Sequence, residues 1–266
     1  MSIHSIRAID VHAHFGTYVR GDSEMRDRFS SAAPEALVQR AGKTNIELTI
    51  VSPMTALMPR LHGDAVKGNS ESAQVVGTVE GLRYWVVVNP LAPPSYEQAT
   101  EMLGNPKCVG IKIHPEEHGY KIGEHGRKLF EFASEQRAVM LTHSGEQNSL
   151  PADYVQLAND FPDVTLILAH LGCGWDDDPS HQVRAVQATK RGNVYVDTSS
   201  AQNILPHLIE WAVAEIGSDR LLFGTDSPCY YAPMQRARID YAEIPDADKR
   251  RILRDNALQV LGLQLP

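Results

Sequence analysis

Short runs of apolar and β-branched residues recur along the chain, and most of them lack strict alternation with polar residues. Such continuous runs are typical of parallel strands that are buried on both faces. They predict eight strands, at residues 6–11, 47–51, 84–88, 109–113, 139–142, 165–169, 194–196 and 221–223.

Segments with a helical period or with helix-start signals separate these strands. The clearest helices are predicted at residues 34–41, 95–103, 124–136, 151–161, 180–190 and 206–215, and a last one at 247–261 closes the chain. Eight strands that alternate with helices favour an α/β fold, a (β/α)8 TIM barrel, with residues 1–266 as a single domain. A doubly wound open sheet is the alternative, but the Gly-rich first turn usual in that fold is missing.

Two long polar stretches, 17–33 and 53–68, each follow a predicted strand. In a barrel, the segments that follow strands lie at the face that carries the chemistry. We therefore expect both stretches to be loops beside an active site.

Composition changes this picture little. The chain is 42% hydrophobic and 22% charged, which is usual for a globular domain. Its net charge of -8 disfavours broad contact with nucleic acid or with an anionic membrane, and no long apolar run is present. The three cysteines are odd in number and scattered, which suits a reducing compartment, so we expect a cytoplasmic protein.

Potential metal ligands lie at the ends of four predicted strands. If the strands close into a barrel, these ends meet around one mouth. Imidazoles and a carboxylate suit one divalent ion, Zn²⁺ above all, with Mn²⁺, Fe²⁺, Co²⁺ and Ni²⁺ as competitors. Such an ion lowers the pKa of a bound water and makes it a nucleophile at neutral pH. The candidates are His12 and His14 after the first strand, His143 after the fifth, His170 after the sixth and Asp226 after the eighth.

A His-x-His pair alone is weak evidence, because a single histidine more often forms ordinary hydrogen bonds than binds metal. In the alternative without metal, Asp226 caps the segment after the eighth strand and the histidines bond to loop carbonyls. The placement of all these residues at strand ends favours the metal interpretation.

Five motifs in order resemble the amidohydrolase superfamily, most closely the amidohydrolase-related group that includes aminocarboxymuconate-semialdehyde decarboxylase. The resemblance implies that His12, His14, His143 and Asp226 hold the ion. It also implies that His170 acts as an acid, a base or a charge-stabilising group, and that Asp226 moves the proton. The motifs are Ile9-Asp10-Val11-His12-Ala13-His14, Gly110-Ile111-Lys112-Ile113-His114-Pro115, Thr142-His143-Ser144-Gly145, Ala169-His170-Leu171-Gly172 and Phe223-Gly224-Thr225-Asp226-Ser227-Pro228.

Four further residues are candidates for substrate binding. Lys112 lies where binuclear relatives carry a carboxylated lysine, but the local sequence looks more like that of mononuclear members. We therefore expect Lys112 to face substrate or to pair with Asp10 or Asp197. His114 shares its face of the strand and would contact substrate or Lys112. The other two candidates are Trp175 after the sixth strand and Arg60 in the second long loop.

The first functional hypothesis is a metal-dependent hydrolase that cleaves an ester, lactone or amide bond of a small molecule with a metal-activated water. The alternative is a metal-dependent non-oxidative decarboxylase or related lyase of an unsaturated or aromatic acid. A TatD-type metal-dependent nuclease is a lesser alternative, since the fourth strand offers no glutamate ligand and the chain is acidic. The sequence leaves a homodimer open, because dimers are common for enzymes of this kind.

Overall fold

The fold is a nearly closed parallel β-barrel. The computed structural model describes residues 5–200, 202 and 204–265. Its eight strands pair in sequence order, each parallel to the next. They are β1 (Ala8–Phe15), β2 (Ile46–Pro53), β3 (Leu82–Val87), β4 (Cys108–Ile113), β5 (Met140–Thr142), β6 (Leu166–Leu168), β7 (Val194–Asp197) and β8 (Leu221–Leu222).

Hydrogen bonds between β1 and the segment after β8 bring the last strand beside the first. The amide of Val11 donates to the carbonyl of Phe223 at 2.9 Å, and the amide of Asp226 donates to the carbonyl of His12 at 2.7 Å. The amide of His14 donates to the carbonyl of Ser227 at 2.6 Å. The eight strands thus surround a common axis, and the segment that carries Asp226 is fixed directly against the histidines of β1.

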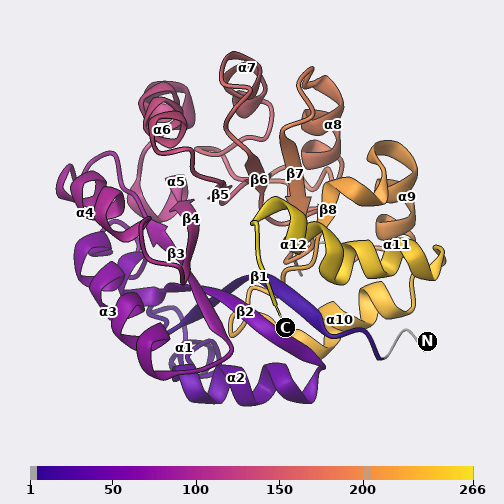
Figure 1. The fold of residues 1–266 in the computed structure, drawn as a ribbon, viewed down its shortest axis with the longest axis horizontal. Coiled ribbons are helices and arrows are strands. Elements are labelled where there is room, and N and C mark those ends of the chain that lie inside the picture. The colour runs from indigo at the N-terminus through magenta and orange to yellow at the C-terminus, as the bar shows by residue number, and fades with distance from the viewer. Residues whose placement is uncertain (1–4, 201, 203, 266) are drawn as a thin grey trace.

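Helices surround the barrel in the order in which they follow the strands (Figure 1). They are α1 (Glu24–Phe29), α2 (Pro34–Lys43), α3 (Ala65–Thr78), α4 (Pro94–Met102), α5 (Pro115–His118), α6 (Ile122–Gln136), α7 (Asp153–Asp160), α8 (His181–Ala188), α9 (Leu208–Ile216), α10 (Ala232–Asp240), α11 (Asp246–Arg250) and α12 (Asn256–Val260), with the shorter or irregular turns η2 (Met54–Ala56), η3 (Ser218–Arg220) and η4 (Arg251–Asp255). The single-domain α/β barrel expected from the sequence is confirmed.

The strands are buried on both sides, which explains their continuous apolar runs. Ile9 and Val11 point into the barrel, where they join Leu48, Ile50 and Trp85 in one apolar cluster. Two larger clusters fill the space between the strands and the surrounding helices. Two parts of the core therefore hold each strand, one inside the barrel and one outside.

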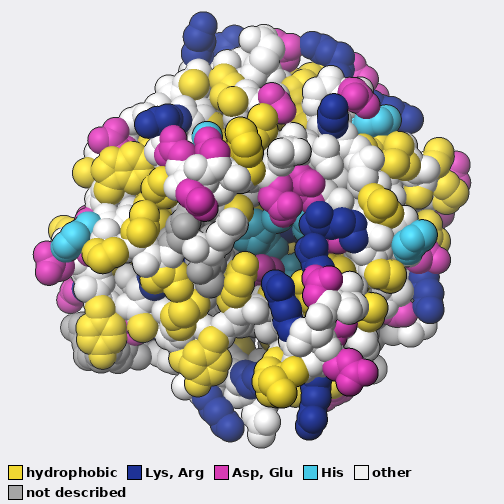
Figure 2. All heavy atoms as spheres, turned by 180° about the vertical axis from the view of Figure 1, so that it is seen from behind, with side chains coloured by type: hydrophobic (Ala, Val, Ile, Leu, Met, Phe, Trp, Pro, Cys, Tyr) yellow, Lys and Arg dark blue, Asp and Glu magenta, His cyan; other side chains and the backbone are white. Residues whose placement is uncertain are grey.

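The two ends of the barrel differ. At one end the C-terminal segment crosses the barrel, and Leu258, Leu261 and Leu263 pack against its interior cluster (Figure 1). The opposite face is hollowed at its centre, where histidine side chains are visible among acidic and basic ones (Figure 2). The strands end at this second face, so the open end is the one expected to carry the chemistry.

Several elements differ from the sequence-based expectations. The first strand extends to Phe15 instead of ending at residue 11, so His12 and His14 lie on the strand itself. The helices α3 and α10 were not predicted. The stretch 17–33 contains α1, and 53–68 contains η2 and the start of α3, so neither is entirely loop.

All three cysteines are free thiols, as their scatter suggested. Among the described residues, no helix combines the length and the apolar character needed to cross a bilayer.

Candidate metal centre

Strand β1 presents two imidazoles to the cavity at the open end of the barrel. The Nδ1 of His12 donates to Oδ2 of Asp197 at 2.8 Å, and the Nδ1 of His14 donates to the carbonyl of Ser52 at 3.1 Å. Both rings are nearly fully buried, and both line the cavity. Because a partner holds each Nδ1, the Nε2 atoms are the nitrogens available to a ligand, an arrangement usual for metal-binding histidines.

Asp226 completes a group of three donor atoms. Its Oδ1 lies 3.0 Å from Nε2 of His14 and 3.7 Å from Nε2 of His12. The three residues offer ligand atoms that all lie within 4.8 Å of one another. Two imidazole nitrogens and one carboxylate oxygen suit a divalent ion such as Zn²⁺ or Mn²⁺.

The protonation states of Asp226 and His12 also suit the binding of a cation. Burial alone would raise the pKa of Asp226, but the hydrogen bond with His14 and the nearby His170 and His12 hold it well below its usual range. Burial lowers the pKa of His12 well below its usual value, so this ring is neutral. Nε2 of His14 faces Oδ1 of Asp226 at 3.0 Å, and a cation between the two atoms would take the place of a proton in this contact.

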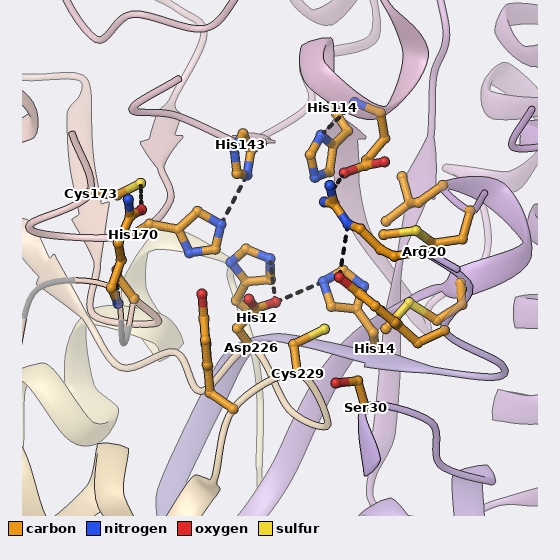
Figure 3. Close-up of a pocket in the computed structure, with 18 of the residues that line it drawn as sticks. His12, His14, Arg20, Ser30, His114, His143, His170, Cys173, Asp226 and Cys229 are labelled. Carbon is orange, nitrogen blue, oxygen red and sulfur yellow. Dashed lines mark hydrogen bonds and ion pairs between the residues drawn. The ribbon is translucent and has the colours of Figure 1, made fainter. Parts of the chain in front are cut away.

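His143 and His170 form a second pair beside this group. Nε2 of His170 lies 3.0 Å from Nδ1 of His143 (Figure 3). The other ring nitrogen of His143, Nε2, lies 2.9 Å from Oε1 of Glu146. His143 therefore lines the same cavity but lies outside the group of His12, His14 and Asp226. Burial lowers the pKa of His170 well below its usual value, so its imidazole is neutral.

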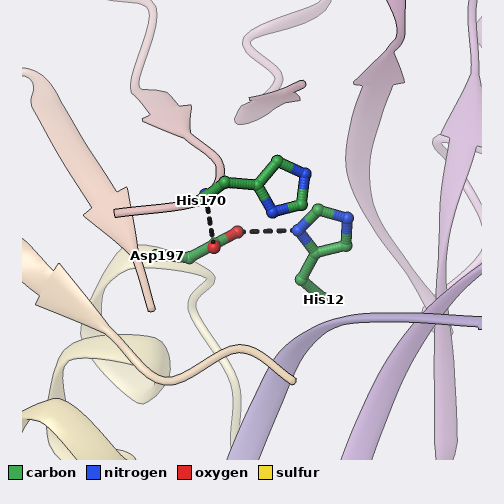
Figure 4. Close-up of side chains that lie close together, drawn as sticks. All are labelled: His12, His170 and Asp197. Atoms are coloured by element: carbon green, nitrogen blue, oxygen red, sulfur yellow. Dashed lines mark hydrogen bonds and ion pairs between the residues drawn. The ribbon is translucent and has the colours of Figure 1, made fainter. Parts of the chain in front are cut away.

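Asp197 is a site residue that sequence reasoning considered only as a partner for Lys112. At the end of β7, its Oδ2 accepts from His12 and its Oδ1 accepts from the amide of His170 at 3.0 Å (Figure 4). The hydroxyl of Ser199 donates to the same carboxylate and lies 2.7 Å from Nδ1 of His170. Although His12, His170 and Asp197 also form a group of potential ligands, this carboxylate already accepts from the ring of His12, the backbone amide of His170 and the hydroxyl of Ser199. In the sequence, only the position of Asp197 at the end of a predicted strand could have identified it as a site residue.

Lys112 and His114 come from β4 and the turn after it. Lys112 is completely buried, and its Nζ lies 2.9 Å from Nε2 of His12. Burial lowers the pKa of Lys112 to about 8, although the charges of Asp197 and Asp226 oppose the shift. The sequence predicted that Lys112 faces substrate or pairs with Asp10 or Asp197; its contact is with His12, and it is not among the residues that line the cavity. His114 lines the cavity and stacks on His143 at 4.2 Å between ring centroids.

The two remaining candidates do not line the cavity. Trp175 lies at the surface with 55% of its area exposed. Arg60 donates to Glu117 at 3.0 Å and lies 3.7 Å from Glu146, so protein carboxylates engage its guanidinium.

Arg20 is a cavity residue that the sequence did not single out. It donates to Oε1 of Glu117 at 2.6 Å and to the hydroxyl of Tyr18 at 2.8 Å, and it points into the cavity beside His14 (Figure 3). Arg26 of α1 also lines the cavity. Both lie in the stretch 17–33, whose conformation no sequence pattern revealed. They add two guanidinium groups to a lining that also includes the carboxylates of Glu117, Glu146 and Asp226.

Comparison with known proteins adds the family context. The profile of the amidohydrolase family matches residues 9–263 of this chain. None of the curated proteins matches the sequence.

Solved structures show the same fold. A 5-carboxyvanillate decarboxylase from Novosphingobium aromaticivorans, complexed with manganese and 4-hydroxy-3-methoxy-5-nitrobenzoic acid, is similar with a TM-score of 0.74 and 14% identity, covering 98% of this chain and 97% of that chain. A 2,6-dihydroxybenzoate decarboxylase complexed with 2,6-dihydroxybenzoate has a TM-score of 0.74 and 16% identity, covering 97% of this chain and 99% of that chain. A dihydroxybenzoic acid decarboxylase from Polaromonas sp. JS666, with manganese and the inhibitor 2-nitroresorcinol, has a TM-score of 0.71 and 16% identity, covering 96% of each chain. At these identities the likeness concerns the fold.

Proposed function

The chain belongs to the amidohydrolase family, and from this premise we propose that it is a metal-dependent decarboxylase of a small aromatic or unsaturated acid. The observation that carries the proposal is the convergence of ligand atoms of His12, His14 and Asp226 within 4.8 Å of one another, at a cavity that Arg20 also lines. The similar structures named as decarboxylases favour this reaction over the hydrolysis that the sequence put first.

We assign the metal to His12, His14 and Asp226. His143 would join them as a fourth ligand by giving up its contact with Glu146 or with His170. A bound divalent cation supplies Lewis-acid polarisation of substrate oxygens. Zn²⁺ and Mn²⁺ both suit imidazole and carboxylate donors, and two of the similar structures hold manganese. Asp197 and the carbonyl of Ser52 hold the two β1 imidazoles in the required orientation.

The chain's own residues would bind the acid and move its proton. Arg20, held in place by Glu117 and Tyr18, would pair with a substrate carboxylate or phenolate. Asp226 is a carboxylate at neutral pH, so it would accept a proton from a hydroxyl of the substrate or from solvent and deliver it to the carbon from which CO₂ leaves. The neutral imidazole of His170 lies next to His143 and would stabilise negative charge on the substrate.

Hydrolysis remains the second candidate, because the same donors and the same proton acceptor would serve attack by water on an ester, lactone or amide.

An assay of both reactions on one preparation tests the proposal. Protein loaded with Mn²⁺ or Zn²⁺ is given 2,6-dihydroxybenzoate and 5-carboxyvanillate, with CO₂ release as the readout. The same protein is given p-nitrophenyl acetate, with release of p-nitrophenol as the readout. We expect CO₂ release from an aromatic acid. Ester cleavage without CO₂ release from any acid tested would support the hydrolase instead.

The matched variants are Asp226→Asn and Asp177→Asn. Both aspartates have a positive φ, 53° and 64°, so the substitution makes the same chemical change in a similar backbone conformation. We expect Asp226→Asn to lower kcat/KM at least about a hundredfold, as for loss of a general acid or base. Asp177 lies in the exposed turn after Trp175, and its variant should retain wild-type activity.

A further inference from the structure

A second, larger cavity lies beside the metal centre. Its volume is about 730 Å³, against about 140 Å³ for the cavity that the histidines line. Small-molecule sites usually measure about 300–1,000 Å³, so the second cavity has the size of a ligand site. Helix α2 forms one wall with Leu37 and Ala41, and the segment that leads into α10 forms the other with Pro228 and Pro233.

The two cavities share a wall. Ser30, Cys229 and Tyr230 line both of them. Figure 3 shows Ser30 and Cys229 on the side of the metal centre below Asp226 and His14. Cys229 follows Asp226 by only three residues, so the second cavity is lined by the same segment that carries this candidate ligand.

Exposed aromatic side chains flank the second cavity. Phe29 is 67% exposed and Tyr231 is 71% exposed, and both line it. Phe29 ends α1, a helix that buries none of its residues. Large apolar side chains that remain exposed around a hollow are a usual mark of a binding groove.

The charge of the lining favours an anion. Arg40 and Lys43, near the end of α2, line the cavity, and neither forms an ion pair with any residue that the structure describes. Among the described lining residues, Asp10 supplies the only carboxylate, and its oxygens already accept hydrogen bonds from Thr225. Two cations without partners are notable in a chain with a net charge of -8.

We propose that the second cavity is a binding site for an amphipathic organic anion. The apolar body of the ligand lies between α2 and the segment 228–233, next to Phe29 and Tyr231, and its acidic group pairs with Arg40 and Lys43. Such a ligand is either the distal part of a substrate whose reacting group is at the metal centre or a separate effector. Both sources have the same chemistry, and the site does not depend on which reaction the metal centre performs.

The test uses 8-anilinonaphthalene-1-sulfonate, an anionic aromatic probe, followed by its fluorescence on the full chain. We expect one saturable site per chain. The variant Arg40→Glu/Lys43→Glu should raise the Kd of the probe at least about tenfold, and Phe29→Ala/Tyr231→Ala should weaken binding to a similar degree. All four side chains are exposed, so both variants should keep the far-ultraviolet circular dichroism of the wild type.

Matched controls make the same changes elsewhere on the surface. Lys67→Glu/Lys190→Glu repeats the charge reversal and Leu91→Ala removes another exposed apolar side chain, and neither should change the Kd. Absence of saturable binding, or equal Kd values for the cavity variants and these controls, would overturn the proposal. If an acid that the metal centre turns over also displaces the probe, the second cavity holds the distal part of that substrate. If the acid and the probe bind at the same time, the second cavity is the site of a separate effector.

Discussion

At the scale of single residues, the site depends on the carboxylate of Asp197, which orients the ring of His12 and holds the backbone of His170. Asp197 accepts from Nδ1 of His12 through one oxygen and from the amide of His170 through the other. An asparagine keeps the shape but has only one accepting atom, so one of these two bonds is lost. We predict that Asp197→Asn weakens metal binding about 10- to 100-fold, as is usual for the loss of such an orienting group.

Calorimetric titration of the metal-free protein with Zn²⁺ or Mn²⁺ measures this effect. Asp163→Asn is the control, because Asp163 is an exposed carboxylate that accepts a hydrogen bond from Ser134 far from the barrel mouth. Equal metal affinity for Asp197→Asn and the wild type would mean that His12 needs no orienting partner.

Replacement of Lys112 is predicted to have the opposite effect, an increase in metal affinity. The Nζ of Lys112 lies 2.9 Å from Nε2 of His12 and so competes for the lone pair that a metal ion would use. Its positive charge would also repel a nearby divalent ion. We predict that Lys112→Met, which keeps a long side chain in this buried position, raises metal affinity roughly tenfold. Weaker binding in the same titration would show instead that Lys112 holds His12 in place.

Part of this site could be predicted from the sequence. The period of two along a strand places His12 and His14 on one side, and the barrel topology brings the segment after β8 to them. The contact of His143 with Glu146 and the entry of Arg20 into the cavity depend on loop conformation. Loops carry no periodic pattern, so these two features could not be predicted.

At the scale of elements, α3 packs unusually close to the turn η2. A Cβ added at Gly68 would lie 2.6 Å from the backbone nitrogen of Ala56, whereas a Cβ at Gly77 on the same helix would meet nothing within 4 Å. We predict that Gly68→Ala destabilises the protein by about 1–3 kcal/mol through overpacking. Gly77→Ala should be neutral or stabilise by up to about 1 kcal/mol, since alanine favours helix.

Urea unfolding of the two variants gives both free energies. Equal stability of Gly68→Ala and Gly77→Ala would contradict the close packing of α3 on η2. The adjoining Met54 of η2 lines the metal-site cavity, so the packing of this helix also helps to shape the site.

The same helix explains why some elements were not predicted. The buried face of α3 includes Gly68, Asn69 and Ser72, and that of α10 includes Gln235 and Arg236. Because small or polar residues occupy these buried positions, the apolar period that identifies a helix is weak. The strands were predicted because both of their faces are buried in apolar clusters.

At the scale of the whole molecule, buried neutral histidines make stability depend on pH. Burial lowers the pKa of His12, His114, His118 and His170 in the folded chain. Below pH about 6.5 the unfolded chain therefore binds more protons at these groups, and each contributes at most about 1.4 kcal/mol per pH unit. Asp10 acts in the opposite direction, because burial raises its pKa to about 7 and the folded state then binds the extra proton.

The four histidines together have a larger effect than Asp10. We therefore predict that the free energy of unfolding of the metal-free protein decreases as the pH is lowered from 7 to 5. Urea titrations in the presence of a chelator measure it at each pH. A value that stays constant or rises toward pH 5 would mean that the histidines are charged in the folded chain.

The central claim is that His12, His14 and Asp226 hold one divalent ion. Elemental analysis of protein stripped of metal, reloaded with Zn²⁺ or Mn²⁺ and desalted tests it most directly, with His12→Ala/His14→Ala as the variant and His62→Ala/His181→Ala as the matched control outside the cavity. We predict a ratio near one ion per chain in the wild type and the control, and near zero in the variant. A variant that still retains one ion per chain, or a wild type that retains none, would contradict the account.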